Sequence, residues 1–422
     1  MSWSKSNFVY FCISFILASI GGFFTLVALP WLVLSIDNNP LTLSSVIVCM
    51  SLPQGFFILF GGVLSDVYSP YRVLIISRVL FCLTLFALFA LVSSEFMVLW
   101  HLYVFAFFIG TFSSISLSSS QSLLPSLIPE EKLNIGNGIF MGTTQLAQVV
   151  GPILASWVIY TFRNYYQVAE GDVHLFSIAL AFLVDAFALA LSLLLVLRIK
   201  LKANVKSEKI NNFILFFVDG LKFCFRDKAI LLIMVYLLAA AFFIHGPLAI
   251  SMPLLAKQKF MTEITGYGNL YSALGGGLLI GTITAMLVKI PAKSLGFVLV
   301  VCDLISSGVL VSLAHAGALH IAMGHIAIIG FCLGLISVAG TTWFQQRTPA
   351  MYMGRTMSIL LFCIIGFTPV SASIFGFAIA ETSIETALIA SGVLLMIVAG
   401  VGLSFPKLRK IGALPRLASV ED

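Results

Sequence analysis

The stretch FVYFCISFILASIGGFFTLVALPWLVL, residues Phe8–Leu34, contains no charged side chain. An α-helix rises about 1.5 Å per residue, so about 20 apolar residues cross the roughly 30 Å hydrocarbon core of a bilayer. This stretch is longer than the apolar core of a signal peptide, and no A-x-A cleavage pattern follows it. It therefore predicts a helix that crosses the membrane and stays in the mature chain.

The whole chain has the same character. Of its 422 residues, 60% are hydrophobic and only 9% are charged, and the mean hydropathy is +1.09. Soluble domains carry about 25% charged residues. In lipid the backbone polar groups must bond within their own segment, which favours helices, and the alternating pattern of an outer-membrane barrel is absent. The sequence predicts an all-α membrane protein.

Polar, Pro-rich or Gly-rich breaks divide the chain into twelve apolar stretches. The expected spans are residues 8–35, 42–64, 73–93, 97–120, 136–161, 175–197, 230–256, 267–288, 295–314, 318–343, 356–380 and 386–404. An even number of spans places both termini on one side of the membrane.

The distribution of Lys and Arg indicates which side that is. With a cytoplasmic N-terminus, only Arg163, Lys257 and Lys259 of the 23 basic residues fall in outer connections. Because cytoplasmic connections are enriched in Lys and Arg, both termini are expected in the cytoplasm. We expect a multi-pass protein of the bacterial inner (plasma) membrane. The net charge of +6 is then a consequence of topology, and no nucleic-acid partner is expected.

A basic linker separates two sets of six spans. The expected organisation is an N-terminal bundle (1–197), a cytoplasmic linker (198–229), a C-terminal bundle (230–404) and a cytoplasmic tail (405–422). The linker contains FILFFVDGLKFCF (Phe213–Phe225), which predicts an amphipathic helix along the inner membrane surface. Binding to anionic lipid head groups is one interpretation of this linker, and a regulatory docking site is the other.

The two halves show weak internal similarity. VLIISRVL (Val73–Leu80) corresponds to VLVVCDLI (Val298–Ile305), and SQSLLPSLIPEEKLNIGNGI (Ser120–Ile139) corresponds to TTWFQQRTPAMYMGRTMSI (Thr341–Ile359). Parallel repeats of six spans are typical of transporters with a cavity between the repeats.

With these features the chain resembles the major facilitator superfamily, and within it the branch of enterobactin exporters and macrolide efflux proteins. The resemblance is carried by FFIGTFSSISLSSSQSLLPSLIPEEKLNIGNGI, QLAQVVGPILASW, HGPLAISMPLLAKQKF, TGYGNLYSALGGGLLIGT and QQRTPAMYMGRTMSI. It implies twelve transmembrane helices in two pseudo-symmetric six-helix bundles and transport by alternating access.

The resemblance also implies a gate in the connection between spans two and three, GGVLSDVYSPYR (Gly61–Arg72). The superfamily form G-x-x-x-D-R/K-x-G-x-R/K-R/K is met by Gly62, Asp66 and Arg72, but not at three further positions, which are Val67, Ser69 and Tyr71. We group Arg78 with this gate, where it is expected to reach the inner surface or to pair with an acid. The alternative is ordinary topology with a turn cap.

Span five resembles the packing motif of exporters, g-x8-G-x3-G-P-x2-G-G. The matching positions are all small or Pro: Gly138, Ala147, Gly151, Pro152, Ala155 and Ser156. Small residues let two helices approach closely. The resemblance implies export over import, and generic helix packing is the alternative.

Two carboxyl groups lie inside apolar spans. An Asp at a helix centre costs about 2.5–3.5 kcal/mol on insertion scales, so Asp185 and Asp303 are functional candidates. We assign them to proton coupling, with a helix-to-helix hydrogen bond as the structural alternative. Uncharged candidates for a cavity lining are Gln121, Gln145, Gln148, His245 and Asn269. His245 precedes Gly246 and Pro247, where the helix is expected to break.

The sequence thus predicts a secondary active exporter of a siderophore-like, macrolide-like or other amphipathic small molecule. We expect coupling to a proton or ion gradient, contact with membrane lipids and a monomer. No enzymatic activity, cofactor or metal site is expected, since the Cys and His residues lack ligand spacing. An importer of a siderophore or nutrient is the alternative.

Overall fold

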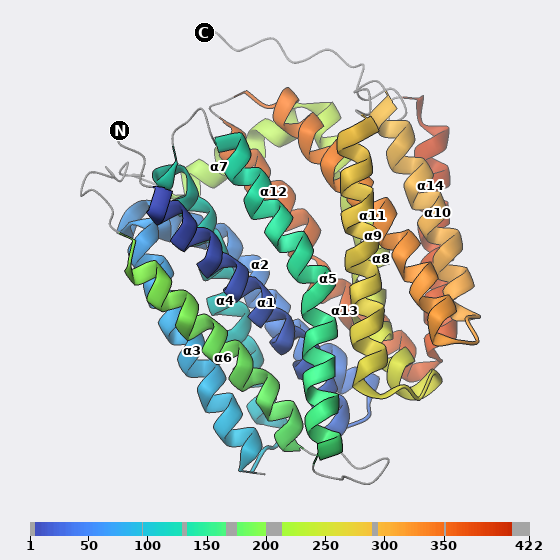
Figure 1. Cartoon of the computed structure of the whole chain (residues 1–422). Helices are drawn as coiled ribbons and strands as arrows, with labels where there is room; N and C mark the ends of the chain where they lie inside the picture. Colours follow the sequence, from blue (N-terminus) through green and yellow to red (C-terminus); the bar gives the residue numbers. More distant parts are fainter. Residues whose placement is uncertain are drawn as a thin grey trace. The chain divides into compact units, whose positions relative to one another are not determined.

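The computed structural model describes residues 5–94, 96–128, 133–165, 175–199, 213–288, 294–349 and 352–406. These residues are almost entirely helical (Figure 1). The helices before the linker are α1 (Lys5–Ile36), α2 (Pro40–Tyr68), α3 (Pro70–Ser93), α4 (Leu99–Leu127), α5 (Leu133–Tyr165) and α6 (Leu175–Leu197). Those that follow are α7 (Phe213–Arg226), α8 (Lys228–Leu254), the π-helical turn η2 (Leu255–Lys259), α9 (Glu263–Val288), α10 (Leu295–Ala314), α11 (Leu319–Arg347), α12 (Met353–Ile365), α13 (Thr368–Glu381) and α14 (Ile384–Ser404).

The twelve predicted spans are confirmed, because twelve helices in the described residues are long and apolar enough to cross a membrane. The ends differ by several residues. The eleventh span differs more, since it consists of two helices, α12 and α13, that meet at Gly366 and Phe367. Pro369 stands in the first turn of α13, where its missing N–H has no intrahelical partner to lose.

Short polar side chains define several helix starts. The Asn39 side chain accepts a hydrogen bond from the Leu41 amide at the start of α2, and Ser383 does the same for Thr386 at the start of α14. Asp227 accepts from the amides of Ala229 and Ile230 as α8 begins. Each cap satisfies N–H groups that a helix leaves unpaired at its first turn.

The break expected at Gly246 and Pro247 is wrong, because α8 continues through both residues to Leu254. Pro247 has no N–H, which deprives the Phe243 carbonyl of its helical partner. Ser391 of α14 donates its hydroxyl to that carbonyl at 2.5 Å, and Ser371 of α13 donates to the Phe242 carbonyl. Ser391 therefore supplies the hydrogen bond that Pro247 removes, as lipid requires, and Ser371 makes a further bond to the adjacent carbonyl.

The chain divides into two compact units. The first comprises Met1–Ile210 together with Pro253–Ser272, which covers the end of α8, the π-helical turn and the start of α9. In this unit α1 packs against α5 and α6, α3 packs against α4 and α6, and α2 packs against α4. The α2–α4 contact is close at Gly110, where an added Cβ would lie 1.9 Å from the Met50 carbonyl oxygen.

The second unit comprises Asn211–Met252 and Ala273–Asp422. Within it α10 packs against α11 and α14. Helices α9 and α11 meet backbone to backbone, since a Cβ on Gly277 or Gly281 would lie 2.0 or 2.1 Å from a carbonyl oxygen of α11. Close helix approach through small residues is the usual way to gain van der Waals contact in lipid.

The predicted amphipathic helix of the linker is present as α7. It packs against α12, and the ring of Phe223 stacks on Tyr352 with 4.6 Å between centroids. Its location at the membrane surface stays a prediction.

Candidate functional site

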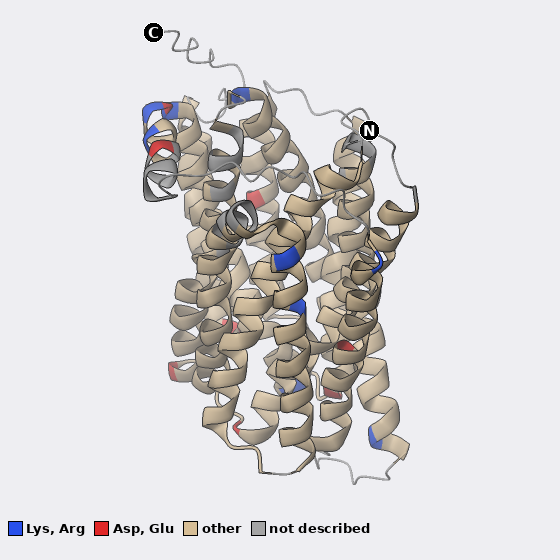
Figure 2. Cartoon of the chain, turned by 90° about the vertical axis from the view of Figure 1, so that its left-hand side faces the viewer, with Lys and Arg blue, Asp and Glu red and all other residues tan. Residues whose placement is uncertain are grey.

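Charged side chains are sparse along the described helices, most of which are drawn in tan in Figure 2. Asp185 near the middle of α6 and Asp303 in α10 are both 0% exposed. Such groups are rare and costly inside membrane spans, and they usually have a function. Their surroundings define the candidate site.

The Asp185 carboxyl group contacts α1. Thr25 donates its hydroxyl to Oδ2 at 2.5 Å, whereas Oδ1 has no hydrogen-bond partner among the described residues. Gly21 of α1 lies against this second oxygen, since a Cβ built there would be 2.6 Å from Oδ1. Only one of the two carboxyl oxygens, Oδ2, is therefore hydrogen-bonded within the described part of the chain, and its partner is on α1.

Arg78 lies in the same unit and is buried, with 1% of its surface exposed. Its Nη1 donates to the hydroxyls of Ser14 and Ser192 at 2.5 and 2.6 Å, which joins α3 to α1 and α6. The expectation that Arg78 reaches the inner surface is wrong. Two serines inside the bundle, which the sequence did not indicate, accept hydrogen bonds from Nη1 in place of water, whereas Nε has no partner among the described residues.

Asp303 has a different environment in the second unit. The Tyr236 hydroxyl on α8 is a polar neighbour of the Asp303 carboxyl group. Neither carboxyl oxygen makes a hydrogen bond of normal geometry among the described residues, and the buried hydroxyl of Ser306 on α10 makes none either. A carboxyl group in this setting is the less satisfied of the two candidates.

Sequence analysis missed a buried ion pair in the second unit. Asp227 and Arg347 form two hydrogen bonds of 2.6 and 2.9 Å, and their side chains are 3% and 8% exposed. Arg347 also lies over the ring of Trp343. Neither residue stands out in the sequence, because Asp227 lies within the charged linker and Arg347 ends an apolar helix.

This ion pair lies next to α7 in sequence and in structure. Burial raises the pKa of the Cys224 thiol on α7 to about 11, so this thiol is protonated at neutral pH and reacts slowly. Cys224 and Phe223 belong to an apolar cluster with residues of α8, α10, α11, α12 and α14. Helix α7 is therefore a packed part of the second unit.

A second set of charges, also missed, lies where α8 and α9 meet. Arg163 of α5 pairs with Glu263 at 2.5 Å, and Lys257 donates to the Leu34 carbonyl near the end of α1. Met261 and Glu263 have φ values of 49° and 52°, a left-handed conformation that non-glycine residues adopt at a cost. All of these residues belong to the first unit.

The exporter-like positions of α5 lie mostly in packed surroundings. Ala147, Gly151, Pro152, Ala155 and Ser156 are all buried, whereas Gly138 is exposed with open space around it. A Cβ on Gly151 would lie 2.6 Å from Phe23 Cβ, and Gly268 of α9 approaches Ser156 and the Pro152 carbonyl equally closely. The close helix approach expected of this pattern is present without Gly138.

The gate positions are only partly described. Gly62 and Asp66 lie on the backbone of α2, but their side chains are outside the described part of the structure. Arg72 in the first turn of α3 is exposed, as an inner-surface anchor requires. The gate stays a prediction, and the buried Arg78 lies apart from Arg72.

The uncharged candidates lie on four helices. Gln121 is exposed at α4, and Gln145 and Gln148 on α5 are partly buried. Asn269 on α9 and His245 on α8 are partly buried as well. Their role as a cavity lining stays a prediction.

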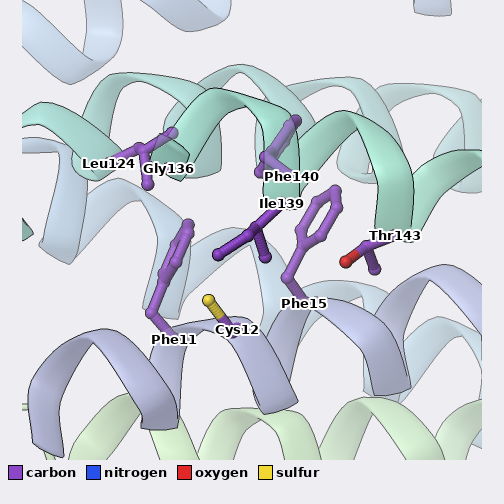
Figure 3. A pocket seen from close by; sticks show the side chains of 8 residues that line it. All are labelled: Phe11, Cys12, Phe15, Leu124, Gly136, Ile139, Phe140 and Thr143. Atoms are coloured by element: carbon purple, nitrogen blue, oxygen red, sulfur yellow. The ribbon is translucent and has the colours of Figure 1, made fainter. Parts of the chain in front are cut away.

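A small apolar crevice lies between α1, α4 and α5 of the first unit. Phe11, Phe15, Ile139 and Phe140 are among the residues that line it (Figure 3). Its enclosed space is about that of a single water molecule, so this crevice does not hold a substrate.

Twelve apolar spans with buried ionisable groups define a multi-pass membrane protein of the kind that moves solutes across bilayers. Residues 11–367 match the sequence model of the Major Facilitator Superfamily, and the chain belongs to this family. No curated protein matches the sequence.

Solved transporters share the fold. The nucleoside transporter NupG is similar with a TM-score of 0.70 and 12% identity, over 95% of this chain and 99% of that chain. A D-xylose–proton symporter has a TM-score of 0.72 and 13% identity, over 99% of this chain and 100% of that chain. A POT family transporter in complex with a thioalcohol-conjugated peptide has a TM-score of 0.70 and 15% identity, over 95% of this chain and 96% of that chain. At these identities the similarity shows the fold alone, which is the all-helical fold of the superfamily.

Proposed function

We propose that the protein is a secondary active exporter of an amphipathic small molecule, such as a siderophore or a macrolide, and that protons drive it. The family makes transport of a small molecule across the membrane the starting point. Coupling, direction and substrate class are the parts that we propose.

The burial of Asp185 and Asp303 carries the proton assignment. Neither carboxyl group has a basic side chain within ion-pair distance in the described residues. In these residues Asp185 is bonded at one oxygen only, and the polar neighbour of Asp303 is the neutral Tyr236 hydroxyl, which makes no hydrogen bond of normal geometry with it. An uncompensated charge in a low-dielectric interior is costly, and the cost is relieved when the group binds a proton. A carboxyl group of this kind can therefore alternate between two charge states during transport.

The small residues of α5 support export. Five of the six exporter-like positions are buried, and Gly151 and Pro152 lie in close contacts with other helices. Tight packing along this helix opposes leakage of solute or protons through the resting carrier. The resemblance to siderophore and macrolide exporters supports the same direction.

The substrate class rests on composition and on that resemblance. The chain has 37 Phe and 13 Met, which supply large and adaptable apolar surfaces. An amphipathic molecule gains more from such surfaces than a sugar does.

The decisive experiment is transport by the purified protein in proteoliposomes with an imposed pH gradient, using siderophores, macrolides, nucleosides and sugars as substrates. Asp185→Asn and Asp303→Asn are expected to lower gradient-driven flux at least about tenfold and to leave substrate exchange without a gradient intact. The matched control is Asp37→Asn, because Asp37 lies outside the spans at the turn after α1.

Unchanged gradient-driven flux in both variants would remove the proton assignment. Accumulation toward the side that corresponds to the cytoplasm would reject export and favour an importer of a siderophore or nutrient.

A further inference from the structure

In the contact between α6 and α1, two residues of α1 lie against the two Asp185 oxygens, and only one of them makes a hydrogen bond. Thr25 occupies Oδ2 through its hydroxyl. Gly21, one turn earlier on α1, faces Oδ1 with only its backbone, and a Cβ there would lie 2.6 Å from Oδ1 and 2.9 Å from the Ala188 Cβ. Oδ2 is thus hydrogen-bonded, whereas Oδ1 has no hydrogen bond among the described residues and lies against the backbone of α1 at Gly21.

The hydroxyl of Thr25 suits this place chemically. It donates to Oδ2 of the charged carboxylate, and it can keep donating to the same oxygen, then the carbonyl oxygen, when a proton binds Oδ1. The contact can therefore persist in both charge states without a change of partner. A valine of the same shape cannot make this bond.

Other ionisable groups around Asp185 come from α3. The Cys82 thiol donates to the Ala186 carbonyl at 3.4 Å, and Arg78 lies one turn further toward the start of α3 with its serine partners. On α5, which also packs against α6, the described charged and tyrosine side chains lie in the last turns of the helix, at Tyr160, Arg163 and Tyr165. On α1 no ionisable side chain lies between Cys12 and the end of the helix.

We propose that Thr25 and Gly21 are the positioning residues of the Asp185 carboxyl group and link its protonation to the packing of α1. Thr25 occupies Oδ2, so an incoming proton binds Oδ1, in the space that Gly21 leaves. No bond within the protein breaks, and the proton comes from water and returns to it. A carbon atom does not fit in this space, since a Gly21 Cβ would lie 2.6 Å from Oδ1, so a proton bound at Oδ1 changes the contact between α6 and α1. This inference rests on the proposed proton coupling.

The test compares two single variants with two matched controls in the proteoliposome assay. Thr25→Val is expected to lower gradient-driven flux at least about tenfold, the usual cost of losing a hydrogen bond to a charged group. Gly21→Ala is expected to lower it as well, because its methyl group would lie 2.6 Å from Oδ1. Thr25→Ser keeps the hydroxyl and is expected to stay within about twofold of the unmodified protein. Gly22→Ala is expected to be harmless, because nothing lies within 4 Å of its Cβ position.

A second measurement distinguishes a role of Thr25 in positioning the Asp185 carboxyl group from a general loss of folding or activity. In infrared difference spectra, the carbonyl band that Asp185→Asn removes is expected to shift in Thr25→Val. It is expected to stay in place in Thr84→Val, where the lost hydroxyl bonded only to the Leu80 carbonyl of its own helix. Substrate exchange without a gradient is expected to survive in Thr25→Val.

The outcomes distinguish the two proposals. Full flux in Asp185→Asn would overturn the coupling role itself. Loss of flux in Asp185→Asn with normal flux in Thr25→Val overturns only the positioning role, and so does a Thr25→Ser protein as damaged as Thr25→Val. Loss of exchange together with gradient-driven flux in Thr25→Val also counts against it, because the effect is then general. If Gly21→Ala does not fold, the Thr25 pair decides alone.

Discussion

Two ion pairs and one buried arginine show how burial determines what a charged side chain contributes to stability. Arg163 and Glu263 are partly exposed, at 16% and 35% of their side chains, and exposed pairs contribute only about 0–1 kcal/mol. Asp227 and Arg347 are almost fully buried, so neither can regain water when the other is lost. Arg78 is buried with two serine hydroxyls as partners of Nη1, so these hydrogen bonds offset only part of the cost of burying its charge.

We expect Asp227→Asn to lower the free energy of unfolding by about 3–5 kcal/mol, because it leaves the Arg347 guanidinium buried without its countercharge. The asparagine can still cap α8, so the loss measures the ion pair more than the cap. Thermal unfolding of the purified protein in detergent measures the effect. Arg226→Gln, at an exposed neighbour in sequence, is the control and should change little. Equal stability of the two variants would show that the pair is dispensable.

At the scale of elements, α8 shows how a helix crosses the membrane with a proline in its interior. The residues that permit this come from α13 and α14, which lie more than a hundred positions later in the chain. Gly246 lets α13 approach, since a Cβ there would lie 1.9 Å from Ser371 Oγ and 2.7 Å from its backbone carbon. The continuity of α8 is thus a property of three helices together.

We expect Ser391→Ala to destabilise the protein by about 1–3 kcal/mol, because it leaves the Phe243 carbonyl without a partner inside the bundle. Gly246→Ala should also destabilise it, since the Ser371 backbone must move. The controls are Ser373→Ala, whose hydroxyl bonds only within α13, and Gly400→Ala, which has open space at its Cβ position. Thermal unfolding of the four variants measures this, and equal melting temperatures would contradict the account of α8.

At the scale of the molecule, the distribution of basic residues predicts the orientation. The buried position of Arg78 removes one residue from the inner set, but the three outer residues remain a small minority of the 23. The excess of basic residues in the inner connections therefore remains when Arg78 is left out. Both termini and the basic linker are expected in the cytoplasm.

We expect a cysteine introduced at Lys206 in the linker to react with a membrane-impermeant maleimide only from the cytoplasmic side. A cysteine at Asn38, between α1 and α2, should react only from the opposite side. Labelling of intact cells and of inverted vesicles measures this in a variant whose seven native cysteines are replaced. Labelling of Lys206→Cys in intact cells would reverse the topology and with it the direction of the proposed transport.

The particular errors of sequence analysis share one cause. Gly246–Pro247 was expected to break α8 and Arg78 to reach the surface, because both inferences considered one helix at a time. The groups that overturn them, Ser391, Ser14 and Ser192, are ordinary serines whose importance comes only from their positions opposite Phe243 and Arg78. The Asp227–Arg347 pair escaped notice for the same reason, since its members lie 120 positions apart.

The number of spans, their helical nature, the family and the candidate carboxyl groups all follow from the sequence by itself. The physical reason is that lipid requires each span to be apolar and internally hydrogen-bonded, so every span and every exception within it is visible locally. The tertiary structure alone decided which buried groups have partners. A hydrogen bond between helices depends on which face each helix presents to the next, and the order of residues along one helix does not contain that information.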